Sequence, residues 1–248
     1  MAGSTQLVDN PFGFVKFIEQ ADQLTVGILV ILGAMSLASW YVILTKLWDQ
    51  GRIRKSYAEA QRKFWAAGNL RDGTAALTGR DNVFRMLAED GIRAAQYHEG
   101  HLTEQVSLNE WITVSLYRSA ESVSSRLASS LAVLATTGSV SPFVGLLGTV
   151  WGIYSALTSI SLAGQANLEQ IAGPIGEALI MTAIGLFVAV PAVIGYNWLL
   201  RRNRNIQEKM KYFAADVHTF LVGGERMDTR APLLRGATTR QSAASKSG

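Results

Sequence analysis

The sequence predicts an all-α integral membrane protein with three transmembrane helices, two of them long and extending into a polar helical domain. Only 17% of its 248 residues are charged, against about 25% in an ordinary soluble domain. The charges leave three long gaps of 23, 42 and 23 residues, at 23–45, 127–168 and 178–200. A membrane-spanning helix needs about 20 predominantly apolar residues, so the first and third gaps each fit one span. The middle gap is too long for one span and must contain part of a helical hairpin.

Residues 1–22 precede the first predicted span. They carry a single cation, Lys16, where a cleaved signal peptide has a positive leader. Asn10-Pro11 is a typical helix start, and a short segment follows at 12–18 that is rich in apolar residues around Lys16. We expect this segment to be either a helix lying in the membrane interface or a partly ordered leader.

The first transmembrane helix covers 23–45, and its Trp40 and Tyr41 suit the aromatic belt of a membrane interface. Residues 46–126 follow with 12 Lys/Arg and 10 Asp/Glu, too charged for a further span and long enough for a helical domain. Glycine and asparagine clusters punctuate this segment and predict helices near 50–67, 83–98 and 104–126. We expect the last helix to run unbroken into the second span, because no helix breaker occurs before Gly138.

The second and third transmembrane helices cover 127–162 and 168–200, with a turn at 163–167 between them. At about 1.5 Å per residue both are longer than the ~30 Å hydrocarbon layer. We expect them to project beyond the layer on the side opposite the turn. Residues 201–248 form a basic tail, which we expect to be disordered toward its end because serine, threonine, alanine and arginine dominate there.

Lysine and arginine predict the orientation, because they accumulate on the cytoplasmic side of bacterial membrane proteins. The segment 46–126 holds 12 of them and the tail 10, whereas the opposite side holds only Lys16. We therefore predict a periplasmic N-terminus and turn, with a cytoplasmic central domain and C-terminus. The tail follows a membrane exit directly and has little aromatic interleaving, so we interpret its charge as an anchor at membrane lipids and expect no nucleic-acid partner.

The composition also limits the chemistry of the chain. It has no cysteine, which excludes disulfides, thiolate chemistry and zinc-thiolate sites. His98 and His101 stand three residues apart in a polar stretch with no further ligand nearby, so we expect no metal site. A phosphate-binding glycine loop is missing as well. We expect no cofactor and no enzymatic activity.

Small and hydroxyl side chains are frequent on both long helices. Small residues let helix backbones approach closely, and hydroxyls bond across helices. Proline frees a backbone carbonyl, which membranes tolerate only where protein or water satisfies it. We predict helix packing at six positions, Pro142, Gly145, Gly148, Gly152, Gly185 and Pro191. Because three spans enclose little of a pore, the pattern also predicts a ring of copies or a partner.

Glu177 is the one ionisable residue deep in a predicted span. It stands nine residues past Leu168, about 13 Å along the helix, and we therefore place it near mid-membrane. A charge there costs about 2.5–3.5 kcal/mol or more. Glu177 is then either a protonated side chain that joins helices by a hydrogen bond, or a carboxyl that takes up and releases protons. We favour the second interpretation because neither flanking span contains a cation to pair with it.

Two stretches of the second and third spans stand out. The first, GSVSPFVGLLGTVWGI, covers 138–153 and the second, GPIGEALIMTAIGL, covers 173–186. Both resemble the signature motifs of the MotA/TolQ/ExbB proton-channel family. Val-Pro-Ala-Val at 190–193 and Tyr-Asn at 196–197 follow in the same order as in the family. The resemblance runs over about 131–197, and the three-span layout extends it to most of the chain.

The resemblance implies a proton pathway formed by Thr149, Glu177 and Thr182. Gly176 and Met181 depart from the family, where alanine is commoner. Glu177 and Thr182 are separated by about 140° around an ideal helix, so both cannot point squarely at one narrow pore. Thr182 would instead bond the carbonyl four residues back or meet a neighbouring subunit.

The resemblance also implies partners. ExbB-like members form a homo-oligomeric ring, taken to be a pentamer, around two helices of the single-span protein ExbD, and they work with TonB. Proton flow through such an inner-membrane complex energises outer-membrane uptake of iron-siderophore complexes and cobalamin.

The two motifs do not distinguish an ExbB-like from a TolQ-like member of the family. TolQ shares both motifs but works with TolR and TolA in maintaining the envelope. The Tyr196–Arg202 exit (YNWLLRR) and Asp216-Val217-His218 favour an ExbB-like role, whereas Phe64-Trp65 resembles a TolQ feature. A non-conducting membrane scaffold is a further alternative, although a scaffold does not need an ionisable group at mid-membrane.

Overall fold

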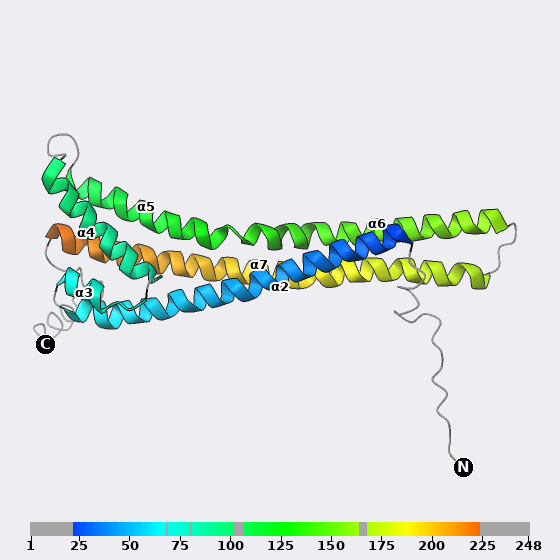
Figure 1. The fold of residues 1–248 in the computed structure, drawn as a ribbon, viewed down its shortest axis with the longest axis horizontal. Helices are drawn as coiled ribbons and strands as arrows, with labels where there is room; N and C mark the ends of the chain where they lie inside the picture. Colours follow the sequence, from blue (N-terminus) through cyan, green and yellow to red (C-terminus); the bar gives the residue numbers. More distant parts are fainter. Residues whose placement is uncertain (1–21, 68, 80, 102–106, 164–167, 224–248) are drawn as a thin grey trace, which may run out of the picture. The chain divides into compact units, whose positions relative to one another are not determined.

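The computed structural model describes residues 22–67, 69–79, 81–101, 107–163 and 168–223, and every regular element within these ranges is a helix. In chain order the elements are α2 (Gln23–Glu59), the π-helical turn η1 (Ala60–Phe64), the 3-10 turn η2 (Trp65–Ala67), α3 (Leu70–Ala76), α4 (Val83–His101), α5 (Leu108–Ala128), α6 (Leu131–Ala163) and α7 (Leu168–Gly223) (Figure 1). Three helical stretches are long and apolar enough to cross a membrane, Gln23–Ala67, Leu108–Thr158 and Ile175–Gly223. The predicted all-α fold class with three transmembrane helices is confirmed.

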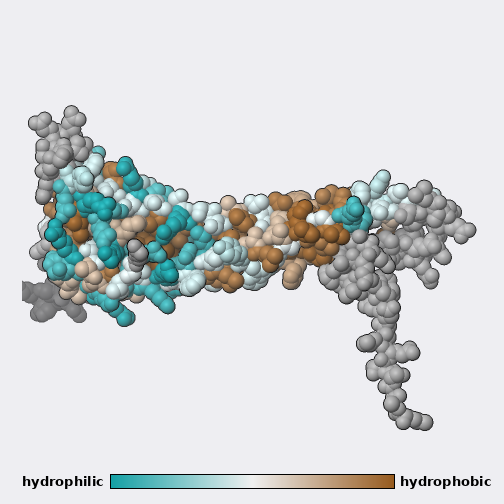
Figure 2. Space-filling model, in the orientation of Figure 1, coloured by the Kyte–Doolittle hydropathy of each residue, from teal (hydrophilic) through white to brown (hydrophobic). Residues whose placement is uncertain are grey.

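The chain divides into two compact units. The apolar unit consists of Met1–Asp49 and Leu127–Arg202, and the polar unit consists of Gln50–Arg126 and Asn203–Gly248. Helices α2 and α7 each contribute residues to both units. In the space-filling view, brown apolar residues gather on the apolar unit and teal hydrophilic residues gather on the polar unit (Figure 2).

In the apolar unit, two clusters of buried side chains join α2 to the hairpin of α6 and α7. The first contains Ile28, Leu32, Met181 and Val188. The second contains Val42, Ile43, Leu131, Leu134 and Leu199. Other large side chains of α2, such as Leu37 and Tyr41, are exposed. In lipid the clusters are held by close packing, because lipid tails are as apolar as the side chains themselves.

The core of the polar unit is aromatic. The Phe213 ring of α7 lies 5.1 Å from the Phe64 ring and 5.2 Å from the Phe84 ring, between centroids. Tyr57 extends the cluster, with its ring 5.3 Å from that of Phe84. Such tilted aromatic pairs each contribute about 0.5–1.5 kcal/mol beyond their burial. Phe64 is therefore a core residue, which explains its presence without reference to a particular branch of the family.

Helix α2 is longer than the sequence predicts. We expected a span at 23–45 followed by a separate helix near 50–67, but α2 continues without a break to Glu59. Two features of the junction favour continuity. Gly51 has open space where a Cβ would lie, so nothing forces a bend. The buried Gln50 side chain donates from Nε2 to Asn203 Oδ1 of α7 at 2.7 Å, which holds this turn in place.

The helices of the polar unit begin at side-chain caps. Helix α4 confirms the prediction near 83–98, and Asn82 Oδ1 accepts hydrogen bonds from the backbone N–H groups of Phe84 and Arg85. Helix α3 was not predicted. It begins because Asn69 Oδ1 accepts from the Asp72 backbone N–H at 2.7 Å, so Gly68-Asn69 includes a helix cap rather than only an interruption.

The long helices differ from the prediction at two junctions. We expected an unbroken helix from 104 into the second span, but Ser129 and Ser130 lie in a turn between α5 and α6. Adjacent serines weaken a helix because their hydroxyls compete for backbone groups. Helix α7 continues past 200 as far as Gly223, so the first part of the basic tail is helical. The interfacial segment, most of the 163–167 turn and the end of the tail lie outside the described residues.

Candidate functional site

Thr149 of α6 lies at the centre of the predicted site and is buried. Its Oγ1 is 3.2 Å from the Gly145 carbonyl oxygen in its own helix and 3.0 Å from the Ala178 carbonyl oxygen of α7. It also hydrogen-bonds to the hydroxyl of Thr182. Two of the three residues in the predicted pathway therefore touch each other within one chain.

This pair changes the account of Thr182. We expected its hydroxyl to bond the carbonyl four residues back or to meet a neighbouring subunit. Instead the carbonyl four residues back, that of Ala178, receives Thr149, and Thr182 pairs with the same Thr149 hydroxyl. The sequence could not reveal this contact because it depends on the register of α6 against α7.

The register of α6 against α7 is set by glycines. A Cβ atom on Gly145 would lie 2.7 Å from the Met181 carbonyl oxygen, and one on Gly185 would lie 2.7 Å from the Ser141 carbonyl oxygen. One on Gly152 would lie 3.0 Å from the Ala178 Cβ. Side chains at these positions would force the backbones apart.

Gly148 has the same role in a milder form. A Cβ there would lie 2.9 Å from the end of the Met181 side chain, which can move. All four glycines thus face the other helix of the same hairpin, and this close approach allows the Thr149 hydroxyl to reach a carbonyl of α7.

Pro142 and Pro191 lie inside α6 and α7 without ending either helix. Pro142 has no N–H, so it leaves the carbonyl of Gly138 without its usual helical partner. Gly138 is packed tightly, because a Cβ there would lie 2.5 Å from the Val193 side chain of α7. Next to the proline, the fully buried Ser141 hydroxyl donates to the Thr137 carbonyl at 2.7 Å. One face of the proline-containing turn is thus buried against α7, whereas Val140 and Phe143 on its other face are exposed.

Glu177 of α7 is half-buried and makes no hydrogen bond or ion pair with any residue that the structure describes. It lies one helical turn before Met181, at the edge of the face that packs against α2 and α6. Thr182 lies at the opposite edge of that face, consistent with their separation of about 140°. The carboxyl group is therefore close to the threonine pair in sequence and points away from it.

The structure relates the level of Glu177 to the start of α2. Its neighbour Ala178 packs against Gly152, and the adjacent Trp151 donates its indole N–H to Asp22, the residue before α2. Glu177 therefore lies at the level where the apolar run of α2 begins, not midway along it.

The other end of that run gives the thickness of the apolar layer. There Val42 and Ile43 pack with Leu131 and Leu199, some 20 residues from the level of Glu177 along α6 and α7, or about 30 Å. This equals the hydrocarbon thickness of a bilayer. Glu177 thus lies toward the turn end of this run. The mid-membrane position that the sequence suggests stays a prediction.

Asp22 and Trp151 are the polar contact that the sequence reasoning missed. Asp22 Oδ1 accepts from the Thr25 backbone N–H at 2.9 Å, and Oδ2 accepts from Trp151 Nε1. Hydrogen bonds from Thr25 and then from Trp151 lower the pKa of Asp22, which is therefore charged at neutral pH. The available signal was a tryptophan within the glycine-rich motif of α6 and a carboxylate just before the first charge-free run.

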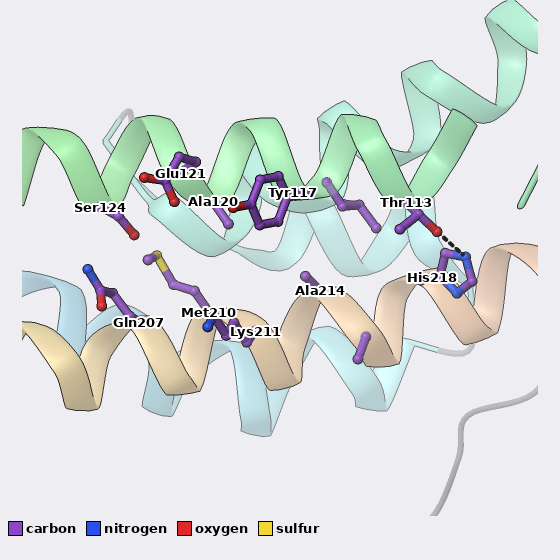
Figure 3. Close-up of a pocket in the computed structure, with 12 residues that line it drawn as sticks. Thr113, Tyr117, Ala120, Glu121, Ser124, Gln207, Met210, Lys211, Ala214 and His218 are labelled. Carbon is purple, nitrogen blue, oxygen red and sulfur yellow. Dashed lines mark hydrogen bonds between the residues drawn. The ribbon is translucent and has the colours of Figure 1, made fainter. Parts of the chain in front are cut away.

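A separate groove lies in the polar unit between α5 and α7, with a volume of about 520 Å³. Its walls carry Tyr117 and Glu121 from α5 and Met210 and Lys211 from α7, and at one end His218 Nε2 is 3.1 Å from the Thr113 hydroxyl (Figure 3). None of the sequence-predicted site residues lines it.

Comparison with known proteins adds to this geometry. Residues 81–212 match the model of the MotA/TolQ/ExbB proton channel family. Biopolymer transport protein ExbB of Xanthomonas campestris pv. campestris is 39% identical over 208 residues, covering 81% of this chain and 82% of that protein. The protein of the same name from Neisseria meningitidis is 33% identical, covering 82% and 94%.

The family also includes similar proteins with another role. Tol-Pal system protein TolQ of Haemophilus influenzae is 34% identical over 205 residues, covering 78% of this chain and 87% of that protein. The matches agree with the apolar helices in describing a multi-pass membrane protein and a subunit of a motor of this type. The chain belongs to the MotA/TolQ/ExbB proton channel family.

Proposed function

We propose that this chain is the proton-conducting subunit of an ExbB-type motor in a bacterial inner membrane, and that Glu177 is its proton carrier. The observation that carries the proposal is the environment of this carboxyl. It is half-buried, lies on α7 where that helix packs closely against α6, and has no partner among the described residues. A permanently paired carboxylate would hold one charge state, whereas an unpartnered one is free to change it.

We propose that the energy comes from protons that cross the membrane down the transmembrane potential. Each proton releases about 2.3 kcal/mol per 100 mV of membrane potential. Capturing that energy requires a group that alternates between neutral and charged states. Glu177 supplies this group, and the Thr149–Thr182 hydroxyl pair holds α6 and α7 together beside it. The two threonines support the pathway and do not themselves carry charge.

The assembly completes the pathway. One chain contributes a single α6–α7 hairpin, so we propose a homo-oligomeric ring, a pentamer, enclosing the helices of an ExbD-like single-span subunit. The N-terminus and the α6–α7 turn face the periplasm, and the polar unit with its excess of Lys/Arg faces the cytoplasm. TonB transmits the force to outer-membrane transporters for iron-siderophore complexes and cobalamin.

A TolQ-like role in the Tol-Pal system is the second candidate. The Haemophilus influenzae relative named TolQ favours it, because its identity of 34% is close to that of the Neisseria ExbB protein at 33%. Both candidates use the same carboxyl, so they differ in partner and not in chemistry.

The test uses host cells that lack either their ExbB or their TolQ protein. The chain is expressed in each strain together with its own single-span partner. We expect restoration of siderophore-dependent growth under iron limitation in the first strain, and no restoration of detergent resistance in the second. The reverse pattern would replace the TonB role by the Tol-Pal role.

Glu177→Gln then tests the carrier itself. The amide preserves shape and hydrogen bonding but cannot titrate, so the ring should assemble normally while growth on siderophores is lost. Glu169→Gln, the same change at the start of α7, is the matched control and should retain growth. Normal growth with Glu177→Gln at a normal membrane level would refute the carrier role and favour a scaffold.

A further inference from the structure

The start of α2 is fastened by a single carboxylate. Asp22 Oδ1 caps the helix by accepting from the Thr25 backbone N–H at 2.9 Å, and its carbonyl oxygen accepts from Val26 N–H at 3.0 Å. The second carboxylate oxygen, Oδ2, accepts the indole N–H of Trp151 from α6. A serine or an asparagine would suffice for the cap alone. The link to α6 requires the second oxygen and the indole.

Trp151 connects this link to the packed hairpin. Its neighbour Gly152 faces α7, where a Cβ would lie 3.0 Å from the Cβ of Ala178. Two residues before Trp151, the Thr149 hydroxyl lies 3.0 Å from the Ala178 carbonyl oxygen. The indole is therefore held at the level of Ala178 by contacts on both sides of it along α6.

Glu177 lies where the start of α2 approaches this level. On α7, Met181 and Val188 pack in one cluster with Ile28 and Leu32 of α2. Glu177 is one turn before Met181 on nearly the same side of α7, and one turn before Ile28 brings α2 to its first residues. Helices α2 and α7 run in the same direction (Figure 1), so the first turn of α2 leads from this cluster toward the level of Glu177.

We infer that Asp22 and Trp151 are positioning residues for proton transfer at Glu177, an inference that rests on the proposed role of Glu177. Their hydrogen bond holds the first turn of α2 against α6 and so closes the side of Glu177 that faces α2. Without it the first turn frays, because the first backbone N–H groups of a helix have no partners within the helix. Water then reaches the carboxyl group from a second side, and the group spends more time ionised.

The test separates the cap from the link. Asp22→Ser retains an acceptor for the Thr25 N–H but cannot reach Trp151. Trp151→Phe retains the ring and removes the N–H. Trp198→Phe, on α7 at the other end of the apolar unit, makes the same change where the ring lies over Arg202 and serves as the control.

The readout is labelling of Glu177 by dicyclohexylcarbodiimide, a reagent that modifies protonated carboxyl groups in apolar surroundings. The rate is followed by mass spectrometry in native membranes containing the full complex, at a series of pH values. We expect Asp22→Ser and Trp151→Phe each to slow labelling at neutral pH about three- to tenfold, the range for one lost hydrogen bond. The double variant should match the single variants, and Trp198→Phe should match the wild type.

Labelling rates at the wild-type value in both variants, at normal membrane levels, would overturn the inference. So would effects that multiply in the double variant, since two residues acting through one bond cannot contribute twice. These outcomes are distinct from a failure of the proposed function. If the Glu177→Gln variant still supports growth, the proposed carrier role is refuted, whatever the labelling shows. If that variant does not support growth, the labelling rates alone decide the role of Asp22 and Trp151.

Discussion

The close approach of α6 and α7 gives the sharpest prediction about stability, at Gly185. A Cβ there would lie 2.7 Å from the Ser141 carbonyl oxygen and 3.0 Å from the Gly145 Cα, both of which are backbone atoms. Ordinary contact begins at 3.4 Å, so Gly185→Ala must move the helices apart by roughly 0.7 Å. The Thr149 hydroxyl, 3.0 Å from the Ala178 carbonyl oxygen, would then be too distant to donate to it.

The cost follows from these two effects. Overpacking a closely packed site costs about 1–3 kcal/mol, and one lost hydrogen bond costs about 1 kcal/mol more. We expect Gly185→Ala to lower the free energy of unfolding by about 2–4 kcal/mol, measured by denaturant titration of the purified chain in detergent.

Gly27→Ala is the matched control. It makes the same change on α2, where nothing lies within 4 Å of the new Cβ. Alanine also favours helix more than glycine does, so this variant should be at least as stable as the wild type. Equal stability of the Gly185→Ala and Gly27→Ala variants would refute the close packing of α6 against α7.

Three further predictions concern assembly, topology and pH. Gly152→Leu should reduce the mass of the detergent-solubilised assembly, because a Cβ already lies 3.0 Å from that of Ala178 and a larger side chain cannot fit; native mass spectrometry showing a wild-type mass would argue against this. A cysteine at Gln165 should react with a membrane-impermeant thiol reagent in intact cells, and one at Gly79 should not; the opposite pattern would reverse the proposed orientation. The pKa of Asp22 is lowered, so its contribution to stability is complete above its ordinary pKa and is lost only as the pH falls through the lowered value. The thermal stability lost in Asp22→Ser should therefore stay constant from neutral pH down to about pH 5, and a loss that shrinks near pH 6 would contradict the assignment.

The fold class could be predicted from the sequence because it depends on a coarse property. Charged residues are costly in lipid, so the gaps in their distribution mark the spans without any knowledge of contacts. Helix boundaries depend on finer features. The sequence suggested that Asn69 lies in a loop, but its side chain caps α3. Asparagine is common both in loops and at helix N-caps, so the residue type alone does not distinguish the two. The helix predicted near 50–67 was expected to be separate from the first span, but α2 continues without a break to Glu59.

The residues of the site could be predicted from the sequence, but their arrangement in space could not. A lone carboxylate in a predicted span indicates a site because a charge is costly in lipid. Clustered glycines indicate close helix packing because they have no side chain. The pairing of Thr149 with Thr182 depends on how α6 slides along α7, and that register is set by the four glycines acting together. No single spacing along the chain contains this information.

The level of Glu177 along the helices illustrates the same limit. Counting from Leu168 locates Glu177 on α7 alone, whereas the contact of Asp22 with Trp151 relates it to the start of α2. If Glu177 is the proton carrier, as proposed, about 20 residues of α7 separate it from the second buried cluster at Leu199. On that path, Ser141 is fully buried and bonded within its own helix. Under the proposed function, we therefore expect other chains of the proposed ring to supply polar groups along that path.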